Sequence, residues 1–208
     1  MIELLTADTP NGKKISIMLE EIKFKYKITK INLYKDEQFK PEFKKLSPFK
    51  KIPVIIDHKA NKSLFESGAI LIYLGEKSGM FYDQDQRSEI NQWLMGQMAY
   101  VGPMLGQHHQ FHYYNPGKSE FGEKRYFKIA LQIYNDLDER LALSKFLAGK
   151  DYSIADIATF PWIARHDWHD IGLKKFKNLT RWYEEISKRK AVQIGYDLLK
   201  KGDKIPKP

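Results

Sequence analysis

The chain has 208 residues, of which 42% are hydrophobic and 13% aromatic, a composition typical of folded proteins and not of disordered ones. No apolar run approaches the ~20 residues that a membrane-spanning helix needs, and the opening residues lack the basic and apolar regions of a signal peptide. We therefore expect a cytoplasmic protein without a membrane partner.

The formal net charge is +9, and only six of the 35 basic residues are arginine. Recognition of bases and phosphates favours the bidentate guanidinium group of arginine, and the lysines are spread along the whole chain. We therefore expect a solvated basic surface and no nucleic-acid partner. The sequence contains no cysteine, which excludes disulfide bonds, thiolate metal sites and any mechanism that uses a thiol of the protein itself.

The first 80 residues alternate between strand and helix patterns. Apolar runs and helical spacing predict, in chain order, a strand over 2–6, a helix over 11–22, a strand over 26–33, a helix over 41–46, strands over 52–57 and 62–65, and a helix over 67–76. The first two strands should be parallel, and the short link between the last two makes that pair antiparallel. This βαβαββα order predicts a small mixed sheet with helices packed on it.

Only helical periodicity follows this region. Apolar residues at helical spacing predict helices that begin near Trp93 and Tyr126 and others over 153–166, 176–188 and 191–200. The chain is therefore expected to combine an α/β domain with an all-α domain. The expected boundaries are residues 1–79 for the first domain, 80–86 for a linker and 87–208 for the helical domain.

The stretch TPNGKK lies between the first strand and the first helix. Thr9 can cap that helix and Pro10 suits its first turn, with Asn11 beside them. Lys13 and Lys14 oppose the helix dipole at this position. Two interpretations stay open for these lysines, which either face a nearby anion or are ordinary solvated side chains.

The segments KIPV and LFESGAI form the most specific pattern. A proline that opens a buried strand is tolerated when its peptide bond is cis and the preceding backbone faces a ligand, although an ordinary edge-strand proline is the alternative. In a thioredoxin-like sheet, Pro53 would turn the backbone of Ile52 toward an extended peptide. Ser67 and the free amides of its helix would bind a carboxylate, and Glu66 would bind an ammonium. The γ-glutamyl end of glutathione has both groups.

Several motifs together resemble those of the glutathione transferases. The stretches TPNGKK, EQFKPEF, LSPFKKIPVI, LFESGAI and GPMLGQHHQF are similar to the bacterial Nu class, the disulfide-bond oxidoreductase type. YSIADIATFPW is similar to the helix-start motif of that superfamily's helical domain, in which Ser153 and Asp156 would form a capping box. The resemblance implies a thioredoxin-like domain followed by a helical bundle, a homodimer whose subunit clefts are partly closed by the partner, and glutathione as substrate or cofactor without a metal.

The resemblance also implies a role for each matching residue. Thr9 and Asn11 would face the sulfur of glutathione, where their hydrogen bonds and the helix dipole stabilise the thiolate nucleophile. The remaining implied glutathione contacts are Gln38, Lys51, the backbone of Ile52 ahead of Pro53, Glu66 and Ser67. Because the chain has no cysteine, any thiol–disulfide exchange must use the sulfurs of the substrates.

A second-substrate site is expected along MLGQHHQFHYY, where Met104, His108 and Phe111 would share a helical face. His108 and His112 have metal-pair spacing, but no third ligand is evident, so no metal is expected. At Gln132 the Nu class would lead us to expect an arginine that helps to hold a second glutathione, which leaves the number of bound glutathiones open.

The favoured function is reduction of disulfide bonds by bound glutathione, with weaker transfer of glutathione to electrophiles or peroxides. The alternative is a non-catalytic glutathione-binding or regulatory module of the same fold. The presence of Thr9, Asn11, Pro53, Glu66 and Ser67 argues for the enzyme, because a module without catalysis need not keep them.

Overall fold

The computed structural model describes all 208 residues. The chain forms two compact units, one made of Met1–Tyr82 and Arg189–Lys204 and the other of Asp83–Lys188 and Ile205–Pro208. These are called the first and the second unit below.

The first unit is built on a four-stranded mixed sheet with the order β2-β1-β3-β4. Its strands are β1 (Ile2–Thr6), β2 (Tyr26–Lys30), β3 (Val54–Asp57) and β4 (Lys62–Phe65). β1 and β2 are parallel, whereas β1–β3 and β3–β4 are antiparallel. The predicted mixed sheet is therefore confirmed, and β2 and β3 are shorter than the sequence pattern suggested.

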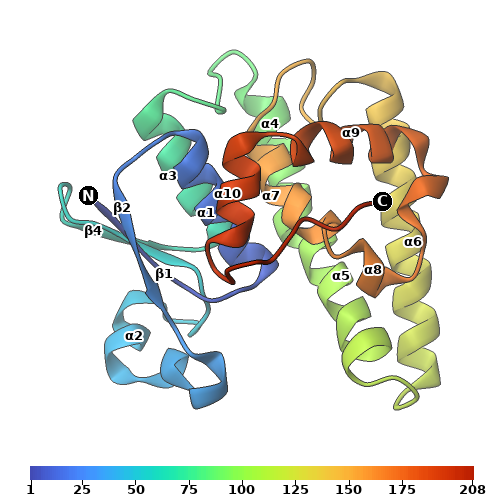
Figure 1. Cartoon of the computed structure of the whole chain (residues 1–208), viewed down its shortest axis with the longest axis horizontal. Helices are drawn as coiled ribbons and strands as arrows, with labels where there is room; N and C mark the ends of the chain where they lie inside the picture. Colours follow the sequence, from blue (N-terminus) through green and yellow to red (C-terminus); the bar gives the residue numbers. More distant parts are fainter. The chain divides into compact units, whose positions relative to one another are not determined.

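Helices cover both faces of this sheet. On one side lie α1 (Pro10–Glu21) and α3 (Ser67–Ser78), and α2 (Pro41–Leu46) lies on the other, after two short 3₁₀ turns, η1 (Leu33–Lys35) and η2 (Glu37–Phe39) (Figure 1). Phe43 of α2 packs on Leu5 and Val54 of the sheet. Leu4 and Ile55, the neighbours of these strand residues, are fully buried, and strand alternation places their side chains on the opposite face.

The first unit also contains α10 (Lys190–Asp197), close to the end of the chain. This helix packs along α1 (Figure 1). A Cβ atom at Gly195 would lie 2.6 Å from the Cα of Ile17, so only glycine allows this close approach. The sequence pattern predicts that this segment belongs to the helical domain, whereas the structure groups it with the sheet. The reason is that α10 contacts α1, which lies nearly 180 residues earlier in the sequence.

The second unit is helical throughout. Its elements are α4 (Arg87–Gly96), the π-helical η3 (Gln97–Val101), α5 (Gly102–His108), the π-helical η4 (His109–Tyr114), α6 (Glu120–Leu143), α7 (Ile154–Ile163), α8 (His166–His169), the 3₁₀ turn η5 (Leu173–Lys175) and α9 (Lys177–Ser187). The aromatic side chains of Phe160, Trp182 and Tyr183 are fully buried in its core.

The predicted capping box at the start of α7 is present. The carboxylate of Asp156 accepts hydrogen bonds from the backbone N–H of Ser153 at 3.0 Å and of Leu147 at 2.9 Å, and from the indole N–H of Trp182 at 2.8 Å. Burial raises the pKa of this carboxyl, and these hydrogen bonds oppose the rise. Asp156 therefore joins the helix start to the core of the second unit.

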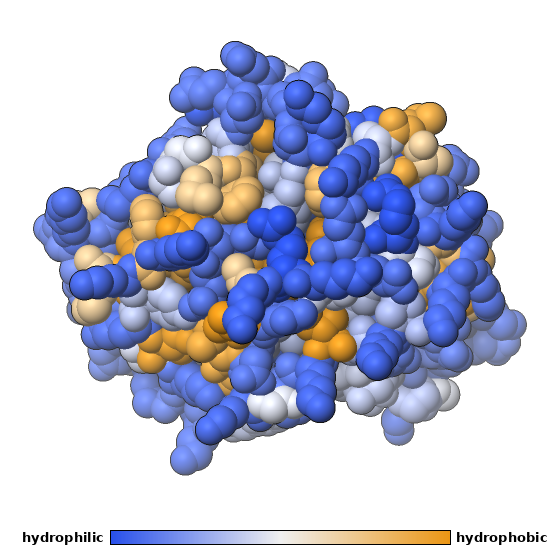
Figure 2. All heavy atoms as spheres, turned by 45° about the horizontal axis from the view of Figure 1, so that its top comes forward, coloured by the Kyte–Doolittle hydropathy of each residue, from blue (hydrophilic) through white to orange (hydrophobic).

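Hydrophilic side chains predominate on the face shown in Figure 2, with separate smaller hydrophobic patches between them. None of the helices combines the length and the apolarity needed to cross a bilayer.

Candidate functional site

Thr9 begins α1 as its N-cap residue, as the sequence predicts. Its hydroxyl oxygen accepts the backbone N–H of Gly12 at 3.1 Å, and its carbonyl accepts the N–H of Lys13 at 2.9 Å. The hydroxyl proton can still be donated to an anion. Thr9 and Asn11 are both half-buried, and the first helical turn adds partial positive charge at this point. The turn therefore suits a bound thiolate.

The peptide bond between Ile52 and Pro53 is cis, which confirms the prediction for this proline. β3 begins only at Val54, which pairs with Leu5, so Ile52 precedes the sheet ladder. The loop before it is fixed by Ser47, whose hydroxyl donates to the carbonyl of Lys51 at 2.8 Å and accepts its N–H at 3.1 Å. The side chain of Lys51 is left exposed at the edge of this loop.

The entrance to α3 has an unusual backbone. Glu66, its N-cap residue, has φ 68° and ψ 116°, a conformation that costs about 1–3 kcal/mol in a residue other than glycine. Ser67 follows it and is only 5% exposed. Backbone outliers of this kind are concentrated at ligand sites, and the first amides of α3 have no partners within the helix. The pair predicted to bind the γ-glutamyl head group, Glu66 for the ammonium and Ser67 for the carboxylate, therefore lies at a constrained helix N-terminus.

Lys14 lies behind this entrance. Its side chain is 1% exposed, and its ammonium is 3.4 Å from the hydroxyl oxygen of Ser67. Burial lowers the pKa of Lys14 well below its usual value, and the negative charge of Glu66 opposes that shift. The interpretation of Lys14 as a solvated lysine is therefore wrong, because it is a buried lysine next to the predicted carboxylate site.

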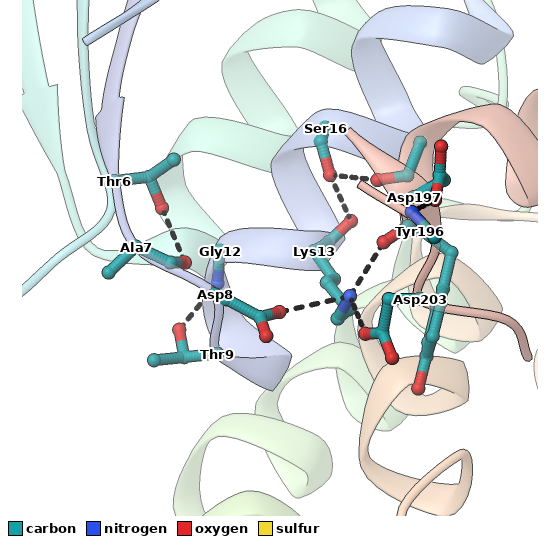
Figure 3. A network of polar contacts seen from close by, with 12 residues as sticks. Thr6, Ala7, Asp8, Thr9, Gly12, Lys13, Ser16, Tyr196, Asp197 and Asp203 are labelled. Atoms are coloured by element: carbon teal, nitrogen blue, oxygen red, sulfur yellow. Dashed lines mark hydrogen bonds and ion pairs between the residues drawn. The ribbon is translucent and has the colours of Figure 1, made fainter. Parts of the chain in front are cut away.

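Lys13 is also completely buried. Its ammonium is 3.0 Å from the carboxylate of Asp8, 2.8 Å from that of Asp203 and 2.6 Å from the carbonyl oxygen of Tyr196 (Figure 3). The solvated interpretation is wrong here too. The anions that face Lys13 are carboxylates of the chain itself, and one of them, Asp203, lies 190 residues away in the sequence, beyond the reach of a local pattern.

Gln38 lies in η2 and is half-buried. Its amide nitrogen is 3.5 Å from a carboxylate oxygen of Asp36, at the limit of a hydrogen bond. Its amide oxygen is buried without a hydrogen-bond partner. An acceptor in this state is available to a donor from a ligand.

The second-substrate residues have different surroundings from those expected. His108 is fully buried, and its Nε2 lies 2.9 Å from the carbonyl oxygen of His169, which argues against contact with a substrate. Met104 is half-buried in α5. Phe111 is half-buried in the π-helical η4 and stacks on Tyr126, so the three residues do not share one regular helix. Gln132 is exposed and donates to Asp136 at 2.7 Å.

Buried histidines are gathered in the second unit, a cluster that the sequence pattern does not indicate. His108 and His109 pack around His169, whose Nδ1 lies 2.6 Å from the hydroxyl of Tyr134. Burial, aided by the charges of His108 and Arg165, lowers the pKa of His109 to about 3. No group of three or more histidine, aspartate or glutamate residues in the described chain could hold a metal ion.

Comparison with known proteins matches a family model to a part of each unit. Residues 3–76 match the model of the glutathione S-transferase N-terminal domain, and residues 103–190 match that of the C-terminal domain. The disulfide-bond oxidoreductase YfcG of Escherichia coli is 42% identical over 207 residues, which cover 96% of this chain and 95% of that protein.

Solved structures give the same result. A Pseudomonas putida glutathione transferase with one glutathione disulfide bound per subunit has a TM-score of 0.88 and 40% identity, covering 97% of this chain and 92% of that one. A Burkholderia graminis glutathione transferase with two glutathione molecules bound per subunit has a TM-score of 0.90 and 39% identity, covering 97% and 89%. With both family domains in order and such similarity over nearly its whole length, the chain belongs to the glutathione S-transferase family.

Proposed function

We propose that this protein is a glutathione-dependent disulfide reductase that uses the thiol of bound glutathione as its nucleophile. The observation on which this depends is that one unit holds both a capped helix start with Thr9 and Asn11 and a constrained helix start with Glu66 and Ser67. The first suits a thiolate, and the second suits the γ-glutamyl head group.

Binding of the head group is supported by charge and by geometry. The carboxylate of the γ-glutamyl end would accept from Ser67 and from the first amides of α3, with the buried amino group of Lys14 behind them. The carboxylate of Glu66 is exposed and can pair with the ligand's ammonium. Between the two ends, the backbone of Ile52 would pair with the cysteinyl group, and Gln38 and Lys51 would contact the cysteinyl-glycine side.

The protein would act on the sulfur through hydrogen bonds and through the partial positive charge at the start of α1. Thr9 and Asn11 would donate to the thiolate, and a hydrogen bond to a charged group contributes about 1.5–3 kcal/mol, or one to two pKa units. A free thiol titrates near pH 8.5, so two such donors would leave most bound glutathione ionised at neutral pH.

The reaction would take place in two exchanges between substrate sulfurs. The thiolate of bound glutathione attacks one sulfur of the disulfide, forms a mixed disulfide and releases the other half as a thiolate. The thiolate of a second glutathione then attacks the mixed disulfide, which yields glutathione disulfide and the second reduced half. The chain contributes no sulfur to either step, since it has no cysteine.

Weaker transferase or peroxidase activity would use the same thiolate against electrophiles or peroxides, with Met104 and Phe111 in contact with the second substrate. We place the enzyme in the cytoplasm, where glutathione is kept reduced. We also propose a homodimer. Phe39 and Phe49 are 58% and 66% exposed, which suits burial against a second copy, and sedimentation velocity would test it.

The proposal is tested by steady-state reduction of hydroxyethyl disulfide, coupled to recycling of glutathione disulfide. The variant is Thr9→Val, which keeps the shape of threonine and loses its hydroxyl. We expect kcat/KM to fall at least tenfold because one thiolate donor is lost. Thr9→Ser, which retains the hydroxyl, should keep most of the activity.

A matched control separates this effect from loss of the helix cap. Ser119 caps α6 and accepts the N–H of Gly122 at 3.1 Å, the same bond that Thr9 makes with Gly12. Ser119→Ala should cost a similar cap energy, about 1 kcal/mol, and leave kcat/KM unchanged.

Two outcomes of the wild-type assay would contradict the proposal. Tight glutathione binding without turnover of any disulfide would identify the non-catalytic module. Absence of glutathione binding by calorimetry would exclude the enzyme and the module together.

A further inference from the structure

The ammonium of Lys13 joins two parts of the first unit that are far apart in the sequence. One part is the turn between β1 and α1, through Asp8, and the other is the last turn of α10 with the segment that follows it, through the carbonyl of Tyr196 and through Asp203 (Figure 3). The ammonium also lies 3.8 Å from the ring centroid of Tyr196. The ammonium donates hydrogen bonds to the carbonyl of Tyr196 and to the carboxylate of Asp203, and it forms an ion pair with the carboxylate of Asp8.

The segment Arg189–Lys204 is fixed to α1 at both ends. At the far end, Arg189 forms two bonds to the carboxylate of Glu21, at 2.6 and 2.9 Å. In the middle, the hydroxyl of Ser16 donates to the carbonyl of Gly195 at 2.6 Å. The ion pair between Lys13 and Asp203 lies at the end of α1 where Thr9 is found.

Lys13 is also linked directly to the Thr9 turn. Its backbone N–H donates to the carbonyl of Thr9, and its ammonium holds the carboxylate of Asp8, the residue before Thr9. Lys13 is fully buried, whereas the carboxylate of Asp203 is 20% exposed. If Asp203 lost its charge, the buried ammonium would keep one carboxylate partner and would shift toward Asp8.

We propose that Asp203, acting through Lys13 and Asp8, positions the turn that presents Thr9 and Asn11 to the sulfur of glutathione. Asp203 is then a positioning residue, and the segment after α10 contributes to the geometry of the thiolate site. The inference rests on the proposed function, since it concerns the thiol that the function requires.

Two effects of Asp203 on the thiol would have opposite signs. The kcat of the enzyme should fall on the acid side of its pH profile, where the bound thiol is protonated, and we call this part of the profile its acid limb. By charge alone, removal of a carboxylate near the site favours the thiolate and moves the acid limb to lower pH. Loss of positioning weakens the hydrogen bonds to the thiolate and moves that limb to higher pH. The direction in which the acid limb moves therefore distinguishes a positioning role of Asp203 from an effect of its charge.

The test compares Asp203→Asn with Glu21→Gln, which loosens the same α1–α10 interface at its other end. We expect Asp203→Asn to lower kcat about tenfold and to move the acid limb upward by about one pH unit. The KM for glutathione should change less than about twofold, because Ser67 and Glu66 are untouched. Glu21→Gln should lower the melting temperature and leave kcat and its pH profile unchanged.

Equal kcat values and pH profiles for the two variants, or a downward shift in Asp203→Asn, would overturn the inference. If Asp203→Asn does not fold, Asp203→Ser is judged by the same criteria. Failure of the proposed function would look different, because the wild type itself would then neither bind glutathione nor reduce a disulfide.

Discussion

Each unit contains a buried cluster of ionisable side chains, and the two clusters are stabilised in opposite ways. In the first unit, Lys13 is surrounded by carboxylates from two distant segments. In the second unit, His109 and His169 are stacked on each other, and burial holds the pKa of both below the ordinary value. The first arrangement depends on every partner being present, and the second depends on the histidines staying neutral. The two units should therefore be sensitive to different perturbations.

The largest effect is expected from Lys13→Met. This change leaves the carboxylates of Asp8 and Asp203 facing each other without their cation, and breaking a buried ion pair costs about 3–5 kcal/mol. Urea denaturation would measure the loss in the free energy of unfolding. A loss below about 1 kcal/mol would show that this network does not hold the first unit together.

Gly195→Ala should have the next largest effect. Its new methyl group would lie 2.6 Å from the Cα of Ile17, and such overpacking costs about 1–3 kcal/mol. Gly96 in α4 is a matched control, because a Cβ there meets nothing within 4 Å. Gly96→Ala should stabilise by up to about 1 kcal/mol, since alanine favours a helix. Equal effects of the two changes would contradict the close packing of α10 on α1.

Because the second unit buries histidines, we expect the free energy of unfolding to fall in mild acid. The folded-state pKa of His109 is lowered, so the unfolded chain binds a proton first as the pH drops below about 6.5. Stability is therefore full above that pH and is lost progressively toward pH 3. Between about pH 7.5 and about pH 5.5, His109 alone should account for a loss of about 1.4 kcal/mol.

His109→Phe tests this by keeping a ring against Trp162 and His169 without a titrating group. Its free energy of unfolding should fall less than that of the wild type over the same pH range. The same pH dependence in both proteins would show that His109 does not stay neutral in the folded state.

The smallest effect is expected at an exposed pair. Lys124 and Glu120 of α6 form an ion pair with 75% and 80% of their side chains exposed. Lys124→Ala should change the free energy of unfolding by less than about 0.5 kcal/mol. A change as large as that of Lys13→Met would mean that burial is not what distinguishes the two lysines.

The sequence predicted the elements that local pattern determines. The helix Pro41–Leu46 and the strand Lys62–Phe65 have the expected bounds, and the caps Thr9 and Ser153 are present. Each depends on side chains within a few residues, so periodicity and capping chemistry suffice to find it.

The sequence could not predict features that depend on distant partners. The burial of Lys13 requires Asp203, and the position of α10 depends on its packing against α1. The surroundings of His108 depend on His169 and on the change from α5 to a π-helical segment. Neither hydrophobic spacing nor charge count encodes such contacts. For the glutathione site, pattern and resemblance named the residues, and the structure adds Lys14 behind Ser67 at the predicted carboxylate position.

The most direct measurement is the pKa of the thiol of glutathione bound to the protein, followed by the ultraviolet absorbance of the thiolate as pH is raised. We predict a value at least one unit below that of free glutathione for the wild type, and a value about one unit or more higher for Thr9→Val than for the wild type. Bound and free glutathione titrating together in the wild type would contradict the account.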